Sequence, residues 1–355
     1  MLKTCLLLFI ICFSQIKTLE KKKDLFDETQ YKYMKLKNRV FKGAIADCDL
    51  MENGKITEKG LKKYEELSKL EIGTIITGGM LLEPHKTIPV PSLEKDDYIK
   101  ELKKLPEVVH KNGVNIIAQV SLMGDLNISP AEIHRLTDLF AVAVARVKAA
   151  GFDGVEIGAN HFGTLSQFLS PMFNHRTDEY GGSDENRARI ITEIIQKIRK
   201  KVGNEYILIL KINSEDADPK GITPEGFITA CKMAEAAGID MIDITGMKWK
   251  KNKENKLVYF DVGKSLAEIL KIPVIITGGA KDLNVINDAL NSSNIQYIGI
   301  CRAILSEPDI LIRWKNCDDR KSRCISCMKC YPEGYSDFSQ EECIFNRKKP
   351  KKFLV

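Results

Sequence analysis

Eight short segments rich in valine, isoleucine and leucine recur along this chain of 355 residues. Most of them are nearly continuous apolar runs, a pattern typical of parallel strands that are covered on both faces. The segments are Val40–Ala46, Ile72–Gly79, Val114–Val120, Gly154–Ala159, Tyr206–Asn213, Met241–Gly246, Pro273–Gly279 and Tyr297–Arg302.

Stretches with helical spacing of apolar residues separate these segments. The clearest begins at Pro130, behind Ser129 as a candidate N-cap, and stops before Gly151. Strand and helix alternating eight times predict an α/β chain folded as a (β/α)8 TIM barrel. A doubly wound open sheet is the alternative, but no glycine-rich dinucleotide loop follows the first strand. The other helices are predicted at Thr57–Leu70, Asn186–Val202 and Pro224–Ala237.

The length suits one barrel, which takes roughly 250 residues, together with an extension. We therefore predict a barrel over residues 25–315 and a cysteine-rich, basic C-terminal extension over 316–355. The formal net charge is +6, but lysine and glutamate alternate throughout the chain. Since no arginine-rich stripe or basic patch with interleaved aromatic residues occurs, nucleic-acid binding is not predicted.

The N-terminus has the pattern of a secretory leader. Lys3 precedes an apolar run from Cys5 to Phe13, and a polar stretch follows. We predict a signal peptide over residues 1–18, which places the protein in the secretory pathway; without it the protein would be cytoplasmic. A buried N-terminal segment is the alternative. The run is shorter than the roughly 20 residues that a membrane span needs, so no membrane span is predicted.

The last two strands end in residues suited to a phosphate group. Gly278 and Gly279 close the seventh strand, and Cys301 and Arg302 close the eighth. Barrels of this type often bind phosphate between these two loops, where glycine allows close approach to the backbone and arginine adds a charge. The alternative is that the two glycines only turn the chain.

Two further polar residues lie on predicted strands. Gln119 ends the third strand, and Lys211 interrupts the apolar fifth strand. A buried lysine needs an anionic partner to keep its charge. That partner is either a phosphate-bearing cofactor that becomes anionic on reduction, or a carboxylate on a neighbouring strand such as Glu156.

Longer motifs resemble the Old Yellow Enzyme group of NAD(P)H:flavin oxidoreductases. Residues 151–157 read GFDGVEI, residues 167–171 read QFLSP, and residues 174–189 read NHRTDEYGGSDENRAR. Leu36–Arg39 and Arg302–Pro308 match as well, and the resemblance runs from about Leu25 to the C-terminus. It implies a barrel that binds FMN, like the N-terminal domain of 2,4-dienoyl-CoA reductase. NAD(P)H would be the reductant and a small molecule the electron acceptor, in ping-pong fashion.

The resemblance also implies which residues contact the cofactor. Gln119 matches a glutamine that meets the flavin ring, and Lys211 replaces an arginine that the family usually has near the pyrimidine edge. Gly43 and Ala44 keep small residues under the ring, where the family usually reads Ala-Pro-Met. The full set of predicted cofactor-binding residues is Gly43, Ala44, Gly79, Gln119, Lys211, Gly278, Gly279, Cys301 and Arg302.

The catalytic loop after the fourth strand departs from the family. Gly158 stands at the first hydrogen-bond donor, His161 at the second, and Gly163 at the tyrosine that gives a proton to carbon. Losing one oxyanion donor typically costs about 100- to 1000-fold in rate. Three explanations remain open. Asn160 and His161 could act as the donor pair, the acceptor could need no carbonyl activation, as quinones do not, or the protein could bind flavin with little turnover.

The chain has ten cysteines, and five of them lie in the extension. Four of these five are candidate metal ligands: Cys324, Cys327, Cys330 and Cys343. Such spacing suits an iron–sulfur cluster or structural zinc. The dienoyl-CoA reductase branch of the family holds a 4Fe–4S cluster at this place, with a spacing that differs by one residue. An oxidising compartment would instead favour disulfides, so we expect disulfides or free thiols over either metal site.

Overall fold

Eight parallel strands close into a ring in the computed structural model, which describes residues 22–86, 90–161, 163–248, 256–330 and 343–346. The ring closes because β6 pairs with β3 on one side and with β8 on the other. Each of the eight predicted apolar segments coincides with one of these strands, with β8 extending one residue beyond its segment, so the predicted barrel is confirmed. The strands are β3 (Val40–Lys42), β6 (Thr74–Ile76), β8 (Asn115–Ser121), β9 (Gly154–Ala159), β10 (Ile207–Asn213), β11 (Met241–Thr245), β12 (Val274–Thr277) and β13 (Tyr297–Ile300).

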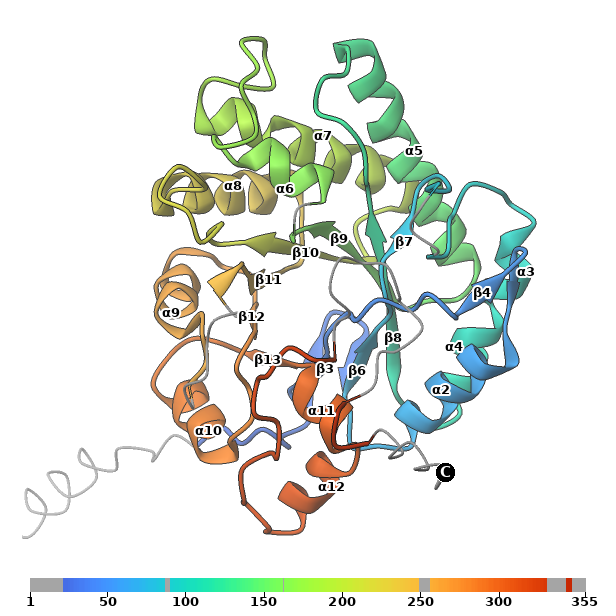
Figure 1. The fold of residues 1–355 in the computed structure, drawn as a ribbon, viewed down its shortest axis with the longest axis vertical. Coiled ribbons are helices and arrows are strands. Elements are labelled where there is room, and N and C mark those ends of the chain that lie inside the picture. The colour runs from blue at the N-terminus through green and yellow to red at the C-terminus, as the bar shows by residue number, and fades with distance from the viewer. Residues whose placement is uncertain (1–21, 87–89, 162, 249–255, 331–342, 347–355) are drawn as a thin grey trace, which may run out of the picture.

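Helices surround the strands on the outside of the ring (Figure 1). The four predicted helices are present, and each begins where a side-chain oxygen accepts a hydrogen bond from a backbone N–H: Thr57, Ser129, Ser183 or Thr223. The helices are α2 (Glu58–Ser68), α3 (Tyr98–Leu102), α4 (Lys104–His110), α5 (Pro130–Ala149), α6 (Thr164–Leu169), α7 (Asp184–Val202), α8 (Pro224–Ala237), α9 (Phe260–Ile269), α10 (Leu283–Asn291), α11 (Arg302–Ser306) and α12 (Ile310–Lys315).

Several short elements were not predicted, because two or three residues carry too little periodicity to be recognised. An antiparallel hairpin, β1 (Thr29–Tyr31) with β2 (Met34–Leu36), precedes the barrel. A second hairpin joins β4 (Met51–Glu52) to β5 (Lys55–Ile56), and β7 (Met80–Leu81) continues alongside β8 after a break. The predicted leader over 1–18 lies outside the described residues. In the part of the chain that is described, no helix has the length and apolarity to cross a membrane.

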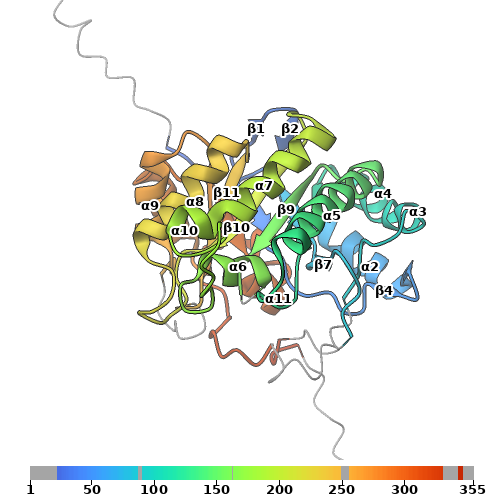
Figure 2. The same ribbon diagram turned by 90° about the horizontal axis from the view of Figure 1, so that it is seen from above.

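The interior of the barrel is apolar at one end and polar at the other. Figure 2 shows the β1–β2 hairpin at one end and α11 with the C-terminal extension at the opposite end. The hairpin contributes Met34 and Leu36 to the apolar cluster, which closes the amino-terminal end of the barrel. The cluster consists of Met34, Leu36, Phe41, Ile76, Ile117, Ile207, Ile209, Met241, Ile275 and Tyr297.

Asp240 joins the hairpin to the amino-terminal end of the barrel. Its buried carboxylate accepts from the backbone N–H of Leu208 at 2.8 Å. It also pairs with Arg199 at 2.6 Å and with Lys32 of the hairpin turn at 2.7 Å. One side chain therefore links the hairpin, α7 and β10.

Replacing Asp240 with alanine should lower the free energy of unfolding by about 3–5 kcal/mol, because it leaves a buried cation without its partner. The matched control is Asp96→Ala, which removes the ion pair of Arg146 with an aspartate that is 80% exposed. That change should cost less than about 1 kcal/mol. Denaturant unfolding of both variants measures the difference, and equal losses would show that Asp240 is not an anchor.

Candidate active site

A pocket of about 620 Å³, partly open to solvent, lies at the carboxyl-terminal ends of the barrel strands. This is the end where barrels of this type carry their active sites. Seven of the residues predicted from the sequence line it: Ala44, His161, Lys211, Gly278, Gly279, Cys301 and Arg302. Cys324, predicted as a candidate metal ligand, lines it as well, together with residues that the sequence did not single out, among them Thr245, Thr277, Lys281 and Ser326.

The other predicted cofactor-binding residues, Gly43, Gly79 and Gln119, are not among the described residues that line the pocket. A Cβ atom on Gly43 would lie 2.5 Å from the sulfur of Cys301, so a larger residue there would require the Cys301 side chain to move. A Cβ atom on Gly79 would lie 3.0 Å from Oε1 of Gln119. These glycines let neighbouring side chains approach the backbone closely. Asn160 likewise is not among the described residues that line the pocket.

The pocket lining includes two adjacent glycines with positive φ and two cationic side chains, features that suit an anion. Gly278 has φ of 149° and Gly279 has φ of 85°, backbone conformations that other residues rarely adopt. A Cβ atom on Gly279 would also collide with the carbonyl oxygen of Lys256. Arg302 and Lys281 face the same end of the pocket. The two glycines thus line the pocket together with two cations, an arrangement that suits the predicted phosphate group.

Five polar side chains meet in the barrel interior at the base of the pocket. Nε2 of Gln119 donates to Oε1 of Glu156 at 2.6 Å. Lys211 donates to the carboxylate of Asp243, whose other oxygen accepts from the hydroxyl of Thr277 at 2.6 Å. Lys211 therefore pairs with a carboxylate on a neighbouring strand, which is one of the two kinds of partner predicted from the sequence. That carboxylate is Asp243 of β11, not Glu156 of β9.

Burial governs the protonation of this interior cluster. It raises the pKa of Glu156 above its ordinary value, and the Asp243 carboxylate raises it further, while Lys211 and Gln119 oppose the rise. Oε2 of Glu156 has no hydrogen-bond acceptor or donor partner among the described residues. A proton on that oxygen would let it donate toward Asp243. Burial alone would lower the pKa of Lys211, but the two carboxylates outweigh it and raise that pKa.

His161 lies at the pocket wall in the loop after β9. Its φ is 48°, in the left-handed region. Its backbone N–H donates to Oδ1 of Asn213 at 3.3 Å, and its Nε2 lies 3.3 Å from the hydroxyl of Thr245. Because Asn213 is on β10 and Thr245 is on β11, His161 leans across two strands, and both neighbours are buried.

The two glycines of the catalytic loop differ in their surroundings. A Cβ atom on Gly158 would lie 2.5 Å from the hydroxyl of Ser121 and 3.3 Å from Oδ1 of Asn160. The amide of Asn160 thus lies beside the direction that a side chain at position 158 would take. A Cβ atom on Gly163 would face the backbone carbonyl of Asn160 at 3.1 Å. A residue other than glycine at position 163 would therefore require the carbonyl of Asn160 to shift slightly.

The four cysteines of the extension come together beside Arg302. Cys324, Cys327, Cys330 and Cys343 line one small pocket with an empty volume of about 310 Å³. All four are free thiols, and burial raises the pKa of Cys330 to about 11. Among the described residues, no group of three or more metal-ligating side chains is placed to hold a metal ion. The structure thus gathers the four predicted cysteines around one pocket.

Replacing Glu156 with glutamine tests the protonation of the interior. A carboxyl group with a raised pKa stabilises the folded protein at low pH, and this stability is lost as the pH rises from the unfolded pKa through the folded one. We therefore expect the unfolding temperature of the unmodified protein to fall relative to Glu156→Gln as the pH rises above about 5. Each unit of pKa shift is worth about 1.4 kcal/mol. A difference that is constant with pH would contradict the assignment.

Comparison with known proteins places the chain among flavin enzymes. The model of the NADH:flavin oxidoreductase / NADH oxidase family matches residues 24–127 and 118–319. N,N-dimethylglycine/sarcosine dehydrogenase of Chromohalobacter salexigens is 26% identical, and the match covers 93% of this chain and 54% of that protein. An NADPH dehydrogenase of Bacillus subtilis is 28% identical, with 80% of this chain and 92% of that protein covered.

Solved structures agree on the fold. The old yellow enzyme homologue from Zymomonas mobilis superimposes with a TM-score of 0.73 at 21% identity, covering 89% of this chain and 99% of that one. A 2-naphthoyl-CoA reductase gives 0.76 at 23% identity, covering 84% of this chain and 53% of that one. The chain spans about half the length of the first of its curated relatives. The family model covers the barrel from its first strand to its last, which shows that this chain belongs to the NADH:flavin oxidoreductase / NADH oxidase family.

Proposed function

We propose that this chain is an FMN-dependent NAD(P)H oxidoreductase of the Old Yellow Enzyme type that reduces a small-molecule acceptor, either a quinone or related xenobiotic or an electron-poor alkene. One observation carries the proposal. A single pocket joins an anion-binding end at Gly278, Gly279 and Arg302 to an end that contains Lys211 and His161. A phosphate-bearing flavin needs both ends at once.

The residues present fit FMN. Gly278 and Gly279 would hold the phosphate through backbone N–H groups, with Arg302 adding charge. Ala44 leaves room for a flat ring, and Lys211 at the barrel interior offers a cation near it. When bound, the flavin would supply the group that accepts a hydride from NAD(P)H and passes electrons on. Because Asp243 already pairs with Lys211, the net positive charge offered to the ring is small.

Asn160 and His161 are the donors that the loop offers to an acceptor. The amide of Asn160 lies beside the position that Gly158 leaves without a side chain, and His161 lines the pocket. Thr245 and Asn213 hold the histidine from below. This arrangement supports the displaced donor pair among the three explanations, and water would provide the proton in place of the missing tyrosine.

Curated relatives support a reductase. They include a cinnamate reductase of Clostridium sporogenes (27% identical), an NADH oxidase of Thermoanaerobacter brockii (24%) and the NADPH dehydrogenase of Bacillus subtilis (28%). Their acceptors differ, so the shared element is the flavin barrel. A flavin-binding protein with little turnover is the second candidate, because Gly158 and Gly163 carry no donor.

Purified protein should be yellow and should release FMN on denaturation, since the pocket binds the phosphate and the ring together. It should oxidise NADH or NADPH when a quinone is added. Absorbance spectra and chromatography of the released flavin measure the first result, and the loss of nicotinamide absorbance measures the second. Colourless protein that takes up no added FMN would overturn the proposal, whereas yellow protein without turnover would favour the second candidate.

Replacing His161 or Asn160 with alanine distinguishes acceptors that need a hydrogen-bond donor from acceptors that do not. If these side chains polarise a substrate carbonyl, each variant should lose about 100-fold or more in the rate of enone reduction. The rate of ferricyanide reduction should stay nearly unchanged, because that acceptor needs no hydrogen-bond donor. Stopped-flow measurement of the two oxidative half-reactions makes the comparison. Enone reduction that is insensitive to both changes would remove the donor pair from the mechanism.

A further inference from the structure

We propose that the C-terminal extension completes the cofactor site, with Lys281 and Ser326 forming a second layer of contacts to the FMN phosphate. The inference rests on the proposed function and adds two residues to it. Lys281 follows the Gly278–Gly279 pair, whereas Ser326 belongs to the extension, and both line the pocket with Arg302. Their contact therefore brings a segment from outside the barrel to the phosphate end.

Direct contacts hold the two residues together. Nζ of Lys281 lies 3.4 Å from the hydroxyl of Ser326. The backbone carbonyl of Lys281 accepts from the N–H of Ser322 at 2.8 Å, so the extension runs alongside the loop after β12. The neighbouring Lys321 pairs with Asp282 at 3.3 Å. The extension is thus fastened to the loop at Lys281 and at Asp282.

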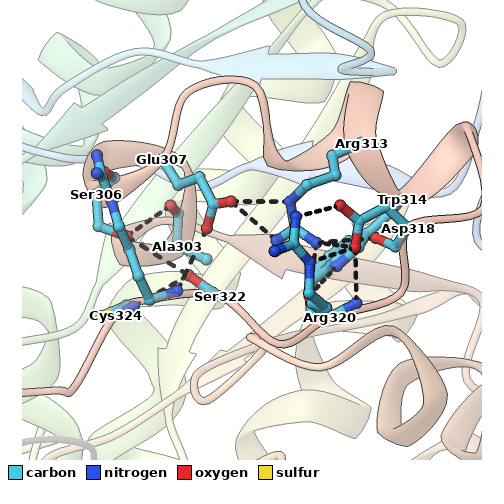
Figure 3. Close-up of polar contacts among 10 residues, drawn as sticks. Ala303, Ser306, Glu307, Arg313, Trp314, Asp318, Arg320, Ser322 and Cys324 are labelled. Atoms are coloured by element: carbon cyan, nitrogen blue, oxygen red, sulfur yellow. Dashed lines mark hydrogen bonds and ion pairs between the residues drawn. The ribbon is translucent and has the colours of Figure 1, made fainter.

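A larger set of polar contacts fixes the same segment to α11 and α12, as Figure 3 shows. Arg313 of α12 pairs with Glu307 at 2.8 Å and with Asp318 at 3.1 Å. Nε of Arg323 donates to the carbonyl oxygen of Ser306 at 2.6 Å. The hydroxyl of Ser322 accepts from the N–H of Cys324 at 3.2 Å. These bonds place the segment at the pocket without help from a ligand.

The positive charges of Lys281 and Arg302 in the pocket lining favour a bound anion. Lys281 is half-buried and forms no ion pair with a carboxylate in the described part of the chain, whereas its neighbour Lys321 does. Burial lowers the pKa of Lys281, and the nearby cations Arg302 and Lys321 lower it further, against the opposing effect of Cys324. Two cations that face one pocket repel each other, and a phosphate dianion between them would remove that repulsion.

Binding of FMN and of riboflavin to the full-length apoprotein tests the inference, because riboflavin has the same ring without the phosphate. Lys281→Met should raise the dissociation constant for FMN by about 10- to 100-fold, as expected for the loss of a hydrogen bond to a charged group. The constant for riboflavin should stay within about twofold. Ser326→Ala should raise the dissociation constant for FMN by a smaller factor, about 2- to 10-fold. Flavin fluorescence titration gives all of these values.

Lys321→Met is the matched control, since it removes the same side chain from a position that pairs with Asp282 and does not line the pocket. It should leave the FMN constant within about twofold, because the side chain of Lys321 is 63% exposed and solvent screens its charge. Lys281→Arg keeps the charge and should retain most of the affinity. Phosphorus NMR of bound FMN should show a shifted resonance in Lys281→Met and an unchanged one in Lys321→Met.

The possible outcomes separate the two claims. If the unmodified protein binds FMN but Lys281→Met binds FMN and riboflavin with unchanged constants, the phosphate contact is wrong and the proposed function stands. Equal weakening of both flavins would assign Lys281 to the structure of the loop, which also overturns the inference. If the unmodified protein binds neither flavin, the proposed function fails, and the inference fails with it.

Discussion

The ion pair between Lys211 and Asp243 is the contact around which the barrel interior is organised. Two buried charges cost several kcal/mol each to desolvate, and only close geometry with further hydrogen bonds offsets that cost. Thr277 supplies one such bond to Asp243, and Glu156 adds a second carboxyl beside the pair. These groups lie above an apolar plug that the β1–β2 hairpin completes. The polar, carboxyl-terminal half of the barrel interior can therefore face a ligand, while the apolar, amino-terminal half stabilises the barrel.

The two ends of the pocket are differently equipped. The proposed phosphate end combines two glycines that have positive φ with Arg302, Lys281 and a segment of the extension. The proposed acceptor end has His161 and Asn160, since Gly158 and Gly163 provide no side chains. Under the proposed function, more residues would hold the cofactor than would bind the acceptor. Such a distribution suits acceptors that are intrinsically electrophilic.

Much of the architecture was predictable because it repeats. Each strand is a continuous apolar run, and Thr57, Ser129, Ser183 and Thr223 begin helices by local hydrogen bonds that depend on a few neighbouring residues. The hairpins and β7 were missed because two or three residues give no periodic signal. Lys281 and Ser326 were missed for another reason: they are 45 residues apart, and only folding brings them into contact. The predicted leader over 1–18 stays a prediction.

The sequence by itself determined the barrel, the family and the residues at the ends of the strands, because alternation of strand and helix and the motifs around Gly278 and Arg302 are local properties. Only the tertiary structure decided which charges meet. Lys211 could have paired with Glu156 or with a cofactor, and the register of β10 against β11 places Asp243 directly opposite it. The same holds for the four cysteines and for Asn160, whose amide lies beside Gly158 because the loop turns back at His161. Register and loop geometry depend on long-range packing, which no short stretch of sequence encodes.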